Sequence, residues 1–98
     1  MTTAIVLVIC DVDQTPETAQ RLADLDGVRE VYSVAGDFDL VAIVHVRDHE
    51  DLADVVTEHI RKTQGVAHTR TLIAFRTYSK HDIEELFSVG FESESGSD

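Results

Sequence analysis

The fold is decided by the middle of the chain, where residues 27–46 read GVREVYSVAGDFDLVAIVHV. Two runs rich in β-branched residues, 28–35 and 39–46, flank the dipeptide Gly36-Asp37. Gly and Asp are turn-forming residues, and strands joined by a short turn pair antiparallel. The stretch therefore predicts a β-hairpin.

The segment before this hairpin predicts a strand followed by a helix. Residues 4–10 (AIVLVIC) are continuously apolar, which is typical of a strand buried on both faces. Thr15 is expected as the N-cap of a helix, with Pro16 in the first helical position and Glu17 at the positive end of the helix dipole. Gly27 is expected to end that helix in the left-handed conformation.

The segment after the hairpin predicts a second helix and a last strand. Asp48 is the expected N-cap and Gly65 the residue that ends this helix. One face of the helix is expected to be buried by residues at helical spacing: Leu52, Val55, Val56, His59 and Ile60. Residues 66–78 then form a long strand, on which Thr69 and Thr71 share one face.

The predicted order is therefore β-α-β-β-α-β, an α+β chain of the ferredoxin-like type. That fold is a four-stranded antiparallel sheet with two helices on one face. Two helices cover one face only, yet the strands over 4–10 and 39–46 are apolar on both faces. We expect the second face to pack on a second subunit about a two-fold axis. The alternative is that the C-terminal segment folds back over it.

Length and net charge limit the number of domains and the kinds of partner that the chain can have. Its 98 residues fit one domain, expected over 1–79, followed by a short helical extension over 80–90 and a disordered acidic tail over 91–98. The net charge of −11 disfavours direct binding to nucleic acid or to an anionic membrane. The single cysteine, Cys10, cannot form an internal disulfide, so the expected location is the cytoplasm.

Two segments carry a resemblance to a known family. Residues 27–41 resemble the "GV…V-x-G-x-Y-D" segment of the Lrp/AsnC family, and residues 65–73 (GVAHTRTLI) resemble its "GV-x-x-T-x-T" strand. Asp48 and Leu52 stand where that family commonly has an acidic residue and a Leu. The chain thus looks like the family's effector-binding (RAM) domain, in a stand-alone form that lacks the helix-turn-helix domain.

The resemblance implies an assembly and a class of ligand. It implies homodimers joined through their sheets, commonly assembled into rings of dimers, and small-molecule effectors, typically amino acids, bound between dimers near the hairpin. Assembly with full-length DNA-binding regulators of the family is a further hypothesis. Three departures leave the effector unnamed: Phe38 replaces the family's usual Tyr, Gln64 stands where Pro is common, and His68 lies next to the first Thr of the Thr-x-Thr pair.

Six residues are the candidate effector-binding set. A free amino acid needs acceptors for its ammonium and donors for its carboxylate. Carboxylates near the turn, open backbone N–H groups and paired hydroxyls supply both, which selects Ala35, Gly36, Asp37, Asp39, Thr69 and Thr71. Each has a plainer interpretation: Asp in turns bonds to nearby backbone, and Thr at alternate positions is common in strands.

Other chemistries are less well supported. The five histidines are spread over two predicted strands, a helix and a loop, and no cysteine pair accompanies them, so no metal or cofactor is expected. The alternative function is a small dimeric α+β-barrel enzyme, a cofactor-independent monooxygenase or isomerase. It would recruit His45 or His68 with Tyr32 in a pocket between helices and sheet. No catalytic pattern singles these residues out, so we expect a binding module.

Overall fold

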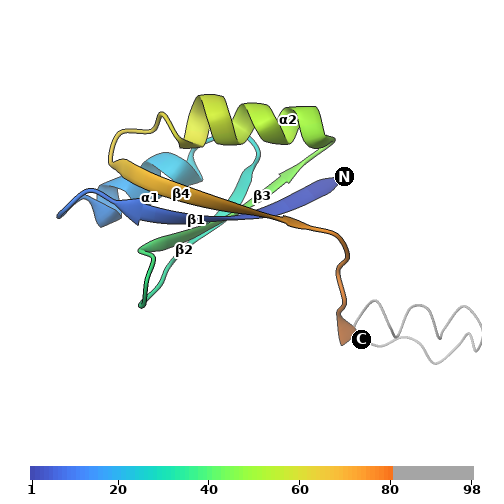
Figure 1. The fold of residues 1–98 in the computed structure, drawn as a ribbon, viewed down its shortest axis with the longest axis horizontal. Helices are drawn as coiled ribbons and strands as arrows, with labels where there is room; N and C mark the ends of the chain where they lie inside the picture. Colours follow the sequence, from blue (N-terminus) through green and yellow to red (C-terminus); the bar gives the residue numbers. More distant parts are fainter. Residues whose placement is uncertain (81–98) are drawn as a thin grey trace, which may run out of the picture.

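The computed structural model describes residues 1–80, and within them it has the predicted order of elements (Figure 1). The elements are β1 (Thr2–Cys10), α1 (Thr15–Ala23), β2 (Val28–Ser33), β3 (Leu40–Val46), α2 (His49–Asp54), the π-helix η1 (Val55–Ile60) and β4 (Val66–Ala74). The helical turn and the tail predicted beyond residue 80 lie outside the described residues.

The four strands form one antiparallel sheet in the order β2-β3-β1-β4. Neighbours in sequence are thus not all neighbours in space: β1 lies between β3 and β4, which is the split βαβ arrangement. Both helical segments lie on one side of the sheet (Figure 1). The ferredoxin-like α+β prediction is confirmed.

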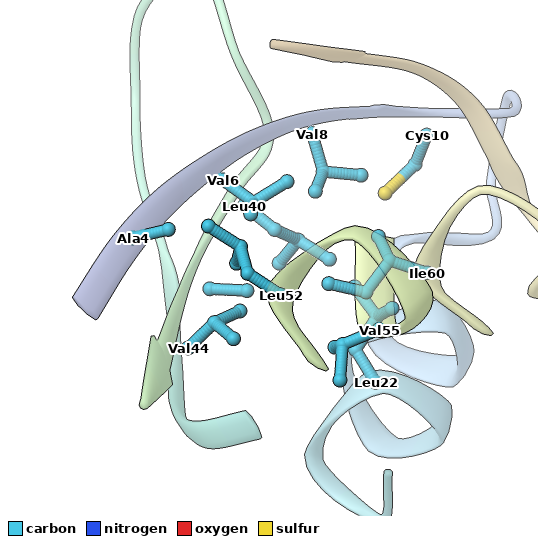
Figure 2. Packing of buried hydrophobic residues seen from close by; sticks show 11 residues of the cluster. Ala4, Val6, Val8, Cys10, Leu22, Leu40, Val44, Leu52, Val55 and Ile60 are labelled. Carbon is cyan, nitrogen blue, oxygen red and sulfur yellow. The ribbon is translucent and has the colours of Figure 1, made fainter. Parts of the chain in front are cut away.

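The core lies between the sheet and the helices. Alternate residues of β1 and β3 point into it, and Figure 2 shows them meeting Leu22 of α1 and Ile60 of η1. The core consists of Ala4, Val6, Val8, Cys10, Leu22, Leu40, Ala42, Val44, Leu52, Val55 and Ile60. Each large aliphatic side chain buried here contributes about 1.5–3 kcal/mol of transfer free energy. No helix of residues 1–80 has the length and apolar character to span a bilayer.

The ends of α1 differ from prediction. Gln14, not Thr15, is the N-cap, and it caps without a side-chain hydrogen bond. A turn in which Gln14 N–H donates to the Asp11 carbonyl starts the helix one residue early, so Thr15 lies inside it. The helix ends at Asp24 in a right-handed conformation. Gly27 does have a positive φ, +92°, but it belongs to the turn into β2.

The second helical segment begins as predicted and then changes its winding. The Asp48 carboxylate accepts from Asp51 N–H at 2.8 Å, which confirms the cap. Residues 55–60 are π-helical, with hydrogen bonds from residue i+5 to residue i. This wider turn buries Ile60 beside Val55 and leaves His59 exposed. The prediction that His59 belongs to the buried stripe is therefore wrong.

The last strand is shorter than predicted. It ends at Ala74, which pairs with Thr3 near the start of β1, so the sheet has no partner strand for residues 75–78. Residues 75–80 lead away from the sheet (Figure 1), with Phe75 and Tyr78 exposed. Strand β2 likewise ends at Ser33, two residues before the predicted end at Ala35.

One glycine is required where η1 leads into β4. Gly65 has a φ of +99°, and a Cβ there would overlap the hydroxyl of Thr18, which is fully buried in α1. Its carbonyl accepts from Asp11 N–H at 2.8 Å, and the neighbouring Gln64 carbonyl accepts from the Arg21 guanidinium at 3.0 Å. This junction therefore holds α1, β1 and β4 in place.

Candidate functional site

The β2–β3 loop presents exposed backbone at one end of the sheet. Ala35, Gly36 and Asp37 are all exposed, and the loop is closed by Val34 N–H donating to the Asp39 carbonyl at 3.0 Å. Gly36 has a φ of +127°, and apart from its two chain neighbours no residue among 1–80 has an atom within 4 Å of where its Cβ would be. Its backbone is therefore accessible to a small ligand.

Asp39 joins the start of β3 to the end of β1 through two hydrogen bonds. Its backbone N–H donates to the Val8 carbonyl at 2.9 Å, and its carboxylate Oδ2 accepts from Cys10 N–H at 2.8 Å. The carboxylate thus bonds to backbone, as the plainer interpretation held, although the backbone is that of β1 and not of the hairpin. Asp39 has a structural role whatever else it binds.

The Cys10 thiol beside this contact is not an activated nucleophile. Burial raises its pKa above the ordinary value, and the negative charges of Asp39 and Asp11 raise it further. Hydrogen bonding to Thr15 and Thr18 acts in the opposite direction and offsets only part of the increase. The thiol is therefore protonated near neutral pH, and we interpret Cys10 as a core residue.

The two threonines lie apart from the loop. Thr71 pairs with Val6 and Thr69 with Val8, both of which point into the core, so the threonines share the helix-covered face of the sheet. Strand β1 separates them from β3 and its loop. Within one chain the structure therefore brings together Ala35, Gly36, Asp37 and Asp39, but not Thr69 and Thr71.

A contact that sequence reasoning missed joins the loop to β4. The Arg70 guanidinium lies over the Phe38 ring, with Cζ 5.7 Å from the ring centroid, which is a cation–π geometry. Arg70 pairs with Leu7 and so projects from the face of the sheet opposite the helices. The sequence signal was the alternation of Arg70 with Thr69 and Thr71, but it gave no reason to pair Arg70 with Phe38.

The face of the sheet opposite the helices, called the open face below, is apolar. Its centre is formed by Ile5, Leu7, Ile9, Val41, Ile43 and Leu72. Polar side chains bond to one another around it: Thr3 Oγ1 and His45 Nδ1 lie 2.8 Å apart, and the Tyr32 hydroxyl donates to Glu30 Oε1 at 2.8 Å. No helix or strand among residues 1–80 covers this face (Figure 1).

Comparison with known proteins identifies the domain. The Lrp/AsnC ligand binding domain family matches residues 3–83. The chain belongs to the Lrp/AsnC family. An uncharacterized HTH-type transcriptional regulator of Pyrococcus furiosus, PF0250, is 37% identical to it over 79 residues, 78% of this chain and 53% of that protein. The chain thus spans about half the length of the curated regulators that it matches.

Solved structures of Lrp/AsnC proteins share the fold. The chain is 45% identical to TTHA0845 of Thermus thermophilus, with a TM-score of 0.76 over 82% of this chain and 100% of that one. It is 32% identical to the feast or famine regulatory protein Rv3291c of M. tuberculosis, solved with L-methionine, with a TM-score of 0.66 over 82% of this chain and 54% of that one.

The enzyme alternative finds little support in this Lrp/AsnC chain. His45 pairs with Thr3, His68 with Ile9 and Tyr32 with Val41, so all three lie on the open face and not between helices and sheet. A homocitrate synthase of Saccharolobus islandicus is 34% identical over 74 residues, but these are 16% of that enzyme. Within residues 1–80, no three His, Cys, Asp or Glu side chains are grouped to hold a metal ion.

Proposed function

We propose that the chain is an amino-acid-binding and oligomerisation module, which acts in transcriptional or metabolic regulation and does not itself bind DNA. The observation that carries this proposal is its similarity, over 82% of its length, to a regulator solved with L-methionine. The net charge of −11 supports the absence of direct DNA binding, because phosphate recognition needs clustered Lys and Arg.

The open face supports dimer formation. A contiguous apolar surface in contact with water marks an interaction site in a small domain, and sheets pack face to face with their inner side chains interdigitated. Two copies joined by a two-fold axis would bury the same surface on each, including the half-exposed Leu72. Further association of dimers, with one another or with DNA-binding relatives, belongs to the same proposal.

The β2–β3 loop supports the effector site. Asp37 is exposed beside the open backbone of Ala35 and Gly36, so a carboxylate and N–H groups are available for an ammonium and a carboxylate. Asp39 sets the position of the loop through Cys10. In the proposed assembly Thr69 and Thr71 would reach the same ligand from a neighbouring dimer, whose β4 edge would then lie against this loop.

Such a site links binding to assembly. A ligand that contacts two dimers binds the larger assembly more tightly than the separate dimers, so it shifts the equilibrium by that difference in affinity. The output is then a change in oligomer, and a change in any partner that the oligomer carries.

The test combines binding with size. The full chain is titrated with each of the twenty amino acids by thermal shift and calorimetry, and its mass is measured with and without each binder. We expect at least one amino acid to raise the melting temperature and change the mass, and Asp37→Asn to weaken its binding. Asp26→Asn, a change of the same kind near α1 and away from the loop, is the matched control. Failure of all twenty amino acids to bind would overturn the proposal.

A further inference from the structure

Charge is unevenly distributed around the open face. Arg70 projects from β4, at one edge of the sheet, and Glu30 projects from β2, at the other edge. The other ionisable side chains on or near this face within residues 1–80 are Tyr32, His68, which pairs with Ile9 on the Arg70 edge, His45, bonded to Thr3, and Arg29, which directly precedes Glu30 and whose positive charge acts on Tyr32. The Arg70 guanidinium therefore stands at one edge of this face, and the Glu30 carboxylate, bonded to the Tyr32 hydroxyl, stands at the other.

Pairing between strands aligns these residues across the sheet. One row consists of Tyr32, Val41, Leu7 and Arg70, and the next row consists of Glu30, Ile43, Ile5 and Leu72. The Tyr32 hydroxyl joins the two rows at the β2 edge by donating to Glu30. Arg70 thus has, at the opposite end of its own row, an aromatic ring whose hydroxyl is bonded to a carboxylate.

Two open faces can be brought together by a two-fold axis that runs either along the strands or across them. If it runs along the strands, β4 of one copy lies over β2 of the other, and Arg70 faces Tyr32 and Glu30 of the second copy. If it runs across the strands, β4 lies over β4, so the two Arg70 side chains approach each other, as do the two Glu30 side chains. Like charges brought together at an interface are unfavourable.

We infer that, in the proposed dimer, Arg70 of each copy stacks on Tyr32 and pairs with Glu30 of the other, and that these two contacts set the direction of the two-fold axis. Packed sheets lie about 10 Å apart, a gap that Arg and Tyr side chains span together. Phe38 already holds the Arg70 guanidinium at 5.7 Å, so less side-chain freedom is lost on pairing. This inference rests on the proposed dimerisation through the open face.

Charge reversal tests the pairing. The dimer dissociation constants of the wild type, Arg70→Glu, Glu30→Arg and the double variant are measured by sedimentation at one fixed pH and ionic strength. We expect each single variant to weaken the dimer roughly tenfold or more, and the double variant to recover most of that loss. Arg61→Glu, the same change on the helical side, is the control and should leave the constant unchanged.

The possible results of this experiment distinguish a failure of the Arg70 pairing from a failure of the proposed dimerisation. A monomeric wild type would overturn the proposed dimerisation, and with it this inference. A dimeric wild type in which Arg70→Glu has no effect would overturn the inference alone. The crossed arrangement predicts this lack of effect, because there Arg70→Glu only replaces one pair of facing like charges with another.

Cross-linking gives a second test that needs no change of charge sign. Tyr32→Cys and Arg70→Cys are prepared separately, mixed, and oxidised with oxidised glutathione. We expect a covalent dimer in the mixture and much less in either variant alone. A covalent dimer from Arg70→Cys alone would overturn the inference. Within one chain the two positions lie three strand spacings, about 14 Å, apart, too far for a disulfide.

Discussion

The two faces of the sheet have the same kind of residue but different surroundings. On the helix-covered face of β1, Ala4, Val6 and Val8 are fully buried. On the open face, Ile5 and Leu7 are just as apolar, yet they are only partly buried. Apolar sequence therefore shows that a surface avoids water, but not whether its own chain or a partner removes it from water.

The largest effect is expected on the covered face. Leu40→Ala removes a fully buried side chain and leaves a cavity, so the free energy of unfolding should fall by about 2–5 kcal/mol. Chemical denaturation at low protein concentration measures it. A loss below about 1 kcal/mol would show that the helices do not pack on this face as described.

The residue that joins the loop to the sheet should have the next largest effect. Asp39→Ala leaves Cys10 N–H without its acceptor, which should lower the free energy of unfolding by about 1–3 kcal/mol. Asp39→Asn keeps an oxygen acceptor and should retain most of the stability. If both variants also keep full affinity for the effector, the carboxylate has a structural role only.

The open face should respond to a different measurement. Leu7→Ala should lower the stability of the separated subunit by about 1 kcal/mol, because Leu7 is only partly buried there. Its dimer should dissociate at much higher protein concentration than that of the wild type. Equal dissociation constants for Leu7→Ala and the wild type would remove Leu7 from the interface.

The smallest effect belongs to the exposed helical surface. Lys62 donates to the Glu58 carboxylate at 2.8 Å and holds the pKa of Glu58 below its ordinary value. A lowered pKa in the folded state means that this stabilisation is present above the unfolded pKa and is lost as the pH falls through the folded one. Since both side chains are exposed, Glu58→Gln should barely change the unfolding midpoint at pH 7. A clear drop at pH 7 would mean that this surface is covered in the assembly.

Local signals in the sequence were sufficient for most of the fold. The Gly36-Asp37 turn, the Asp48 cap and the apolar runs of β1 and β3 act through near neighbours in the chain, so they are readable without coordinates. The ends of elements were less predictable. Strand β4 ends where β1 no longer provides a partner, and the winding of η1 places Ile60, not His59, in the core.

The candidate site could be predicted only in part, because some of its contacts join residues that are far apart in the sequence. The loop residues Ala35, Gly36 and Asp37 are contiguous, and their exposure follows from the turn. The bond from Cys10 N–H to Asp39 and the contact between Arg70 and Phe38 join residues 29 and 32 positions apart. No periodicity in the sequence indicates such pairs.

By itself, the sequence determined the order of elements, the antiparallel sheet and the presence of two apolar faces, because alternation along a strand and helical spacing are local properties of the chain. Only the tertiary structure decided which face the helices cover, and which charged groups stand at opposite edges of the other. Those depend on the strand order β2-β3-β1-β4 and its register, which bring distant residues into one row.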